Sequence, residues 1–163
     1  MATSAEYNLG EFEFPRGWFV VANSSEIVPG KPYNARYFGQ DVVIFRTADG
    51  EVGMLEAYCP HMGTHFGTST TAYIAKAGLN VQGNGIRCPF HGWLFDVDGK
   101  CLETPAEPAD SKLCAGIRQR SYPVVEKSGI LWAYLGEGTP PAFPEIDCFT
   151  APGSHTFAFK GMM

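Results

Sequence analysis

The chain has 163 residues, enough for one domain with a buried core, and charged residues make up only 18% of it. The formal net charge of −5 is mildly acidic, so we expect no nucleic-acid partner. No stretch near the N-terminus is both apolar and long enough to span a bilayer, and we expect neither a secretory leader nor a membrane partner.

Glycine, proline and aromatic residues are abundant, which is typical of many strands joined by turns. Residues 1–14 form a polar N-terminal arm, and residues 14–21 open the first strand. Three pairs of apolar segments then flank turn residues, and each pair is interpreted as a β-hairpin: 41–46 with 52–57, 93–97 with 100–103, and 122–126 with 130–135. Helical periodicity is almost absent, so we predict an all-β domain over 15–136, followed by a Pro-rich exit and tail, 137–163.

Two short segments each combine a cysteine, a histidine and a closing glycine, which lets the backbone turn sharply. They are Cys59-Pro60-His61-Met62-Gly63 and Cys88-Pro89-Phe90-His91-Gly92. Cys-x-His paired with Cys-x-x-His is the ligand pattern of a Rieske [2Fe-2S] centre, in which two cysteines hold one iron and two histidines hold the other. The candidate cofactor ligands are therefore Cys59, His61, Cys88 and His91.

On these motifs the sequence resembles the N-terminal Rieske domain of Rieske non-haem iron oxygenases of the aromatic-ring and steroid hydroxylating type. Pro15-Arg16-Gly17-Trp18 also resembles the opening of oxygenase large subunits. The resemblance implies the Rieske fold, with antiparallel sheets and a small cluster-binding subdomain of two loops. It also implies one-electron transfer from a ferredoxin or flavin reductase, through a Rieske [2Fe-2S] cluster, to a mononuclear iron in a catalytic domain.

Two alternatives remain open. A free-standing Rieske-type ferredoxin would use the same cluster, but such carriers resemble shorter chains that lack an N-terminal extension. A structural zinc module would use the same ligand types, although zinc sites usually pair Cys-x2–4-Cys with His-x3–5-His. The mixed arms of this sequence favour iron and sulfide.

The sequence departs from the family pattern in and between the two loops. Residues 62–87 separate the arms, and the excess is interpreted as an insertion at about 68–79, with one or two helical turns between Thr70 and Ala77 and a hypothetical role in partner docking. Thr64 and Phe90 stand where high-potential relatives have disulfide cysteines, and Trp93 stands where they have a serine. We therefore expect a potential near the low end of the Rieske range.

Few other residues are candidates for chemistry. With His61 and His91 assigned to the cluster, only His65 and His155 remain, and no His/His/carboxylate site for a mononuclear iron can be assembled from them. We expect no catalytic residues in this chain and no oxygen activation by it alone.

The other cysteines, Cys101, Cys114 and Cys148, are interpreted as buried thiols, and an odd cysteine count fits a cytoplasmic location.

Overall fold

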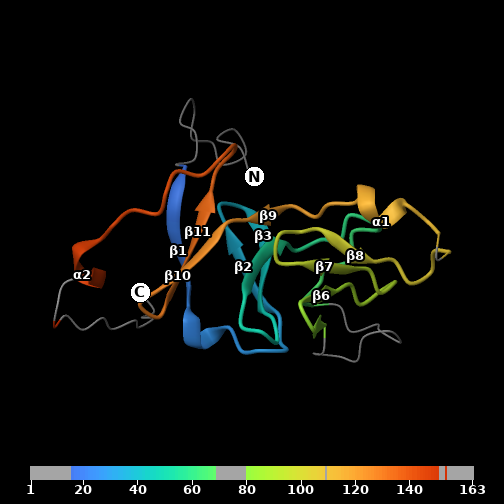
Figure 1. Cartoon of the computed structure of the whole chain (residues 1–163), viewed down its shortest axis with the longest axis horizontal. Helices are drawn as coiled ribbons and strands as arrows, with labels where there is room; N and C mark the ends of the chain where they lie inside the picture. The colour runs from blue at the N-terminus through green and yellow to red at the C-terminus, as the bar shows by residue number, and fades with distance from the viewer. Residues whose placement is uncertain (1–15, 69–79, 109, 151–152, 154–163) are drawn as a thin grey trace.

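A computed structural model describes residues 16–68, 80–108, 110–150 and 153 of the chain (Figure 1). Its strands form three antiparallel sheets, which confirms the expected all-β fold. The first sheet has the order β1 (Gly17–Asn23), β11 (Ile130–Leu135), β10 (Val124–Lys127). The second has the order β2 (Tyr33–Tyr37), β3 (Gln40–Arg46), β4 (Val52–Glu56), β9 (Ser121–Tyr122).

The third sheet has the order β5 (Val81–Gln82), β6 (Gly85–Arg87), β7 (Leu94–Asp96), β8 (Cys101–Glu103). The described helices are single turns: the 3-10 helix η1 (Ser24–Glu26), α1 (Leu113–Gly116) and α2 (Asp147–Thr150). None of the helices in the described part of the chain has the length and apolar character needed to cross a membrane.

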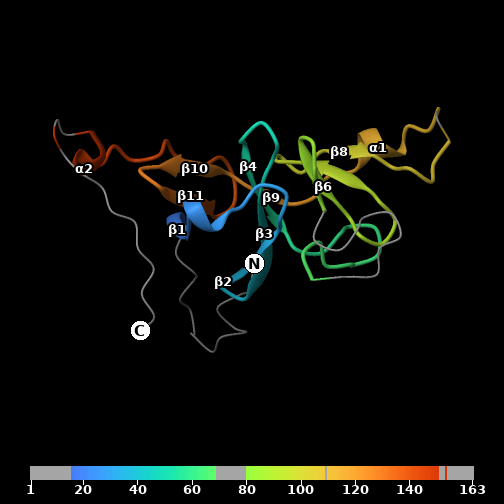
Figure 2. The same ribbon diagram turned by 90° about the horizontal axis from the view of Figure 1, so that it is seen from below.

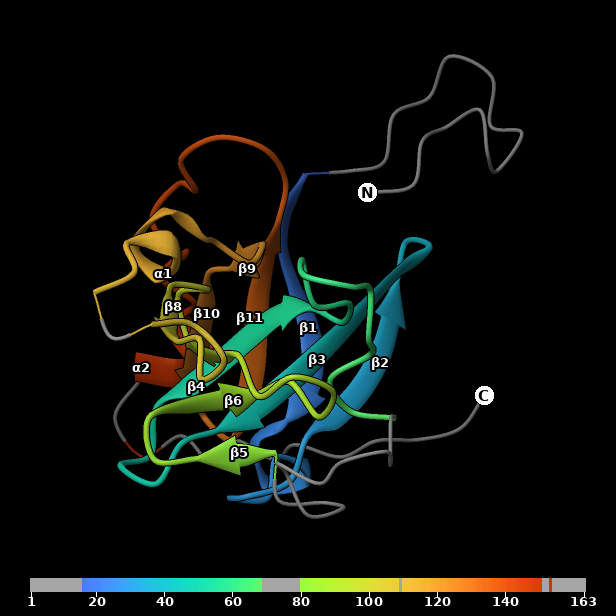
Figure 3. The ribbon, with the colours of Figure 1, turned by 90° about the vertical axis from the view of Figure 1, so that its right-hand side faces the viewer.

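The second sheet lies between two hydrophobic cores, because the side chains of a strand point alternately to its two faces. Val42 and Ile44 pack with β1 and β11, whereas Val43 and Phe45 pack with the third sheet. The run 42–45 is at most 1% exposed, as expected for a strand covered on both faces. Figure 1 shows the first sheet and α2 on one side of the second sheet and the third sheet on the other, and Figure 3 shows β5 and β6 in front of β3.

The three predicted hairpins are present as β3–β4, β7–β8 and β10–β11, although β7 and β8 are shorter than predicted. In the third hairpin Ser128 and Gly129 both have positive φ (52° and 77°), the two-residue turn that matches the twist of paired strands. The predicted single strand 122–126 is wrong. Instead, two short strands lie on either side of Pro123, which has no N–H to donate to a partner strand. Before it, β9 pairs with β4 in the second sheet, and after it, β10 pairs with β11 in the first sheet.

The described residues 136–146, in the region of the predicted Pro-rich exit, contain no strand. This segment returns over the first sheet, where Trp18 Nε1 donates to the Pro141 carbonyl at 3.1 Å and the Phe143 ring meets Trp18 and Trp132 edge-on. Three predictions lie wholly or largely outside the described residues: the arm 1–14, the turns between Thr70 and Ala77, and the insertion 68–79. Strands β2, β5 and β6 were not predicted.

Candidate metal centre

The two cysteine–histidine loops have the same backbone hydrogen-bond frame. Gly63 N–H donates to the Cys59 carbonyl at 2.9 Å, and Cys59 N–H donates to the Thr64 carbonyl at 2.9 Å. In the other loop Gly92 N–H donates to the Cys88 carbonyl at 3.0 Å, and Cys88 N–H donates to the Trp93 carbonyl at 2.8 Å. The closing glycines have φ of 70° and 77°, a left-handed conformation that non-glycine residues adopt at a cost. Histidine occupies the third position of one loop and the fourth position of the other.

The two thiols meet in the interior of the site. Cys59 and Cys88 are each 2% exposed, and a hydrogen bond joins their side chains. That bond raises the pKa of Cys59 and lowers the pKa of Cys88 to about 6, so the two groups share a proton and titrate as a pair. Backbone N–H groups also stabilise each thiolate, from His61 and Met62 for the first sulfur and from Phe90 and His91 for the second.

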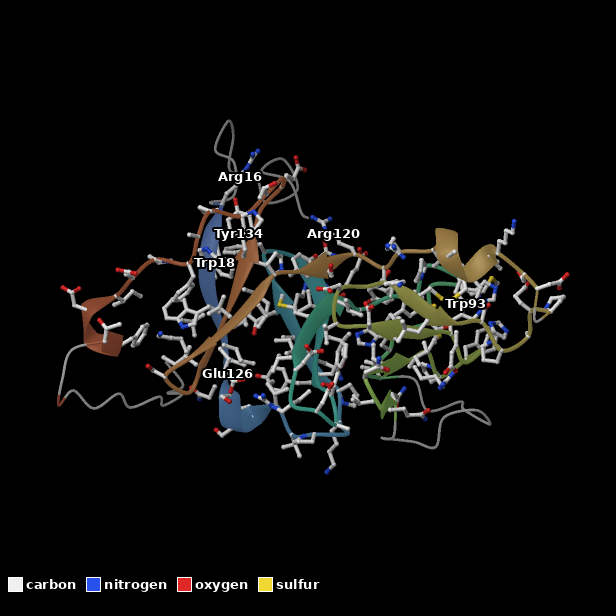
Figure 4. All side chains as sticks on the ribbon, in the orientation of Figure 1. Arg16, Trp18, Trp93, Arg120, Glu126 and Tyr134 are labelled. Atoms are coloured by element: carbon white, nitrogen blue, oxygen red, sulfur yellow. The ribbon has the colours of Figure 1, made fainter. Side chains whose placement is uncertain are left out.

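The two imidazoles meet at the surface. His61 Nδ1 and His91 Nδ1 lie 3.2 Å apart, and His61 is exposed while His91 is half-buried. The His61 ring stacks on the Trp93 indole, with 4.2 Å between centroids and an interplanar angle of 4°. In Figure 4, Trp93 lies at the end of the molecule opposite Trp18 and Tyr134. The four predicted ligands are therefore brought together as a buried thiol pair and a surface imidazole pair.

Three polar side chains outside the motifs hold the loops in place. Gln119, only 6% exposed, donates through Nε2 to the carbonyls of Glu56 and Tyr58, at 2.6 and 2.8 Å, just before the first loop. Asn80, 3% exposed, donates through Nδ2 to the carbonyl of Phe66 at 2.9 Å, just after that loop. The backbone carbonyl of Asn80 accepts from the backbone N–H of Arg87 at 2.6 Å. Asn80 therefore links the two loops.

Arg87 immediately precedes Cys88 and fixes the second loop. Its Nη1 donates to the Gly92 carbonyl at 2.6 Å, and its Nη2 pairs with Glu103 of β8 at 2.5 Å. Its Nε donates to Gln82 of β5 at 2.9 Å. Sequence reasoning missed Arg87, Asn80 and Gln119. The only local signal was their polar character next to apolar strands.

The remaining sequence candidates take other positions. His65 Nδ1 accepts from the N–H groups of Gly67 and Thr68, at 3.0 and 3.2 Å, which supports the expectation of a loop role. Cys101 and Cys114 are free thiols, one buried and the other half-buried. Among the described residues, no three His, Cys, Asp or Glu side chains converge on a point that could hold a single metal ion. His155 and the side chain of Cys148 lie outside the described part of the chain.

Known proteins resemble this chain over most of its length. The family described as Rieske [2Fe-2S] domain matches residues 17–123, more than half of the chain. The phthalate 4,5-dioxygenase oxygenase subunit of Pseudomonas putida is 38% identical over 136 residues, covering 78% of this chain and 29% of the relative. The tert-butanol monooxygenase / tert-amyl alcohol desaturase oxygenase subunit of Aquincola tertiaricarbonis is 40% identical over 156 residues, covering 94% and 31% respectively.

Solved structures agree with these relatives. Dicamba monooxygenase superimposes with a TM-score of 0.64 at 26% identity, covering 83% of this chain and 38% of that chain. The oxygenase in the reduced complex with ferredoxin in carbazole 1,9a-dioxygenase gives a TM-score of 0.63 at 28% identity, covering 78% and 30%. The chain thus spans about a third of the length of the curated relatives it matches.

Proposed function

This chain belongs to the Rieske [2Fe-2S] domain family, and we propose that it is the domain that accepts electrons for a Rieske non-haem iron oxygenase. The family's cofactor is a Rieske-type [2Fe-2S] cluster, which takes up and releases single electrons when bound. The observation that carries the proposal is the separation of the four candidate ligands into a thiol pair and an imidazole pair.

The donor set fits this cofactor. Cys59 and Cys88 would hold one iron as thiolates, and the backbone N–H groups that face their sulfurs would stabilise that charge. His61 and His91 would hold the other iron, since their Nδ1 atoms face each other. Trp93 would fix the plane of the His61 ring, and Arg87 would fix the turn that carries His91.

Burial suggests the side from which a redox partner approaches. The thiols are in the interior, whereas the imidazoles lie at the surface with exposed apolar neighbours: Met62 is 65% exposed and Phe90 41%. Apolar side chains around a functional group favour docking of another protein. We propose that a ferredoxin or flavin reductase delivers electrons at this face. The carbazole 1,9a-dioxygenase complex, in which an oxygenase is bound to a ferredoxin, supports this class of partner.

The length of the related oxygenase subunits indicates where the electrons go after they leave the cluster. The matching oxygenase subunits are about three times as long as the matched region. We propose that residues 15–136 form the Rieske domain and that 137–163 lead from it towards a catalytic domain with a mononuclear iron. We also propose a cytoplasmic location, which the odd number of cysteines in the sequence supports because such a set does not make a complete disulfide framework.

An anaerobic reductive titration of the purified chain tests the function. We expect uptake of about one electron per chain, and reoxidation on mixing with an oxidised ferredoxin of higher potential. The Cys88→Ser variant should lose the electron uptake, whereas Cys148→Ser, altered in α2, should retain it. A chain that takes up no electrons and contains zinc without acid-labile sulfide would support the structural zinc module instead.

A second measurement separates an oxygenase domain from a free-standing ferredoxin. The reduced chain is mixed with the mononuclear-iron domain of a phthalate-dioxygenase-type oxygenase, and single-turnover product is measured. Product formation that depends on the reduced chain supports the oxygenase role. Electron exchange with many redox proteins, but none with such a domain, supports the free-standing carrier.

A further inference from the structure

A second pair of cysteines lies next to the candidate metal centre but takes no part in it. Cys101 begins β8 and Cys114 lies in α1, and their Sγ atoms are 3.3 Å apart. The Cys114 thiol donates to the Cys101 sulfur, and the Cys101 thiol donates to the Glu103 carbonyl at 3.5 Å. A disulfide bond is about 2.05 Å long, so the two sulfurs need to approach each other by little more than about 1 Å to bond.

The two thiols differ in access to solvent. Cys101 is 2% exposed and belongs to the same core as Cys59, Cys88 and Trp93. Cys114 is half-buried and packs against the edge of this core. Burial raises the pKa of Cys101 to about 12, so Cys114 is the thiol that meets an external reagent first.

The chain between the two cysteines is held mainly at its ends. Of the residues between β8 and α1, those from Pro105 to Pro108 are exposed, and Glu107 N–H donates to the Thr104 carbonyl at 3.0 Å within a local turn. The cysteines flank this segment, so a bond between them would close it into a loop on the same lobe as the metal centre. Figure 1 shows α1 beside β8 at this end of the molecule.

We propose that Cys101 and Cys114 form a reversible disulfide, a redox modification site separate from the cluster ligands. The oxidant is a small-molecule disulfide of the glutathione class. Cys114 attacks one sulfur of the reagent, forms a mixed disulfide and releases the first thiol. Cys101 then attacks the Cys114 sulfur and releases the second thiol, so that one reagent disulfide is consumed and both cysteine protons leave on the released thiols.

Tryptic mapping provides a direct test, because Lys100, Lys112 and Arg118 place the two cysteines in different peptides, 101–112 and 113–118. The full chain with its cluster is equilibrated anaerobically in buffers of graded glutathione disulfide to glutathione ratio, alkylated and digested. We expect the two peptides to appear as one cross-linked species at oxidising ratios and to separate after dithiothreitol. The cluster absorbance should be retained throughout.

Two variants make the result specific. Cys114→Ala should abolish the cross-link, and Cys148→Ser should retain it, since α2 lies at the opposite end of the molecule from α1 (Figure 2). The oxidised chain should also have a higher Tm than the reduced chain, because the bond closes a loop, and Cys114→Ala should lose this difference.

Several outcomes would overturn the proposal. They are the absence of the cross-link at every ratio, a stable mixed disulfide at Cys114 without closure, a bond from either residue to another cysteine, and a cross-link that forms only after the cluster is lost. The first two outcomes leave the cluster ligands Cys59 and Cys88 untouched, so the disulfide proposal can fail while the cluster still takes up electrons.

Discussion

At the scale of single residues, the two loops share a backbone frame and differ in the position of their histidine. Cys59 and Cys88 begin the two frames with the same pair of backbone hydrogen bonds. His61 is third in its loop and His91 is fourth, yet their Nδ1 atoms lie 3.2 Å apart. Because the histidine stands one position later in the second loop, two similar turns that follow different strands place their imidazoles side by side.

Trp93 is the residue whose replacement should disturb the imidazole pair most directly. It is 8% exposed and stacks on His61, so Trp93→Leu removes the stacked ring and leaves a cavity. We expect a loss of about 2 kcal/mol in the free energy of unfolding, and a wider spread of histidine nitrogen couplings in pulsed EPR of the reduced protein. Trp93→Phe keeps a stacked ring and should stay near the wild type in both measurements. Identical EPR couplings in the Leu variant would show that the stack does not orient His61.

His65 should make stability depend on pH. Burial lowers its pKa below the ordinary 6.5, and its neutral Nδ1 accepts from Gly67 and Thr68. The unfolded chain binds this proton at a higher pH than the folded chain does. The free energy of unfolding should therefore be highest above pH 6.5 and fall as the pH drops towards the folded-state pKa.

Two variants isolate this contribution in urea unfolding curves measured across that pH range. His65→Asn keeps an acceptor oxygen and cannot titrate, so its stability should fall less than that of the wild type as the pH is lowered. His65→Ala removes the acceptor and should lose about 1–3 kcal/mol at neutral pH. If the wild type and His65→Asn have the same pH slope, His65 does not titrate as described.

At the scale of elements, the hairpins and the metal loops follow from local patterns, while the contacts that hold them do not. Apolar segments around Asp49-Gly50 and Ser128-Gly129 predict β3–β4 and β10–β11, because turn residues and strand propensity are local properties. Gln119 contacts residues about sixty positions earlier, and a single sequence contains no signal for such a pairing. The break at Pro123 was detectable in principle from its missing N–H, but the change of sheet was not.

The third sheet should be sensitive to one glycine. Gly85 pairs with Asp96, and a Cβ added there would lie 2.3 Å from the Phe95 carbonyl oxygen. Backbone cannot move aside as a side chain can, so Gly85→Ala should cost about 1–3 kcal/mol of unfolding free energy. Gly116→Ala is the control, since its Cβ meets no atom within 4 Å. Thermal unfolding compares the two, and equal Tm values would contradict the described β6–β7 packing.

At the scale of the whole molecule, the second sheet joins the first sheet to the metal centre. One face of β3 packs with the first sheet, on which the exit segment lies, and the other face packs with the core that contains Cys59 and Cys88. Arg46 of β3 adds a polar link, since its guanidinium pairs with Glu126 of β10 through two hydrogen bonds at 2.9 and 3.1 Å. The loops are therefore anchored on a strand that is buried on both faces.

EPR of the anaerobically reduced chain, together with iron and acid-labile sulfide analysis, tests most directly whether the thiol pair and the imidazole pair hold a Rieske cluster. We predict about two irons and two sulfides per chain, and a rhombic signal with the low average g value of a cluster that has histidine on one iron. Zinc without acid-labile sulfide, or the signal of an all-cysteine cluster, would contradict the account.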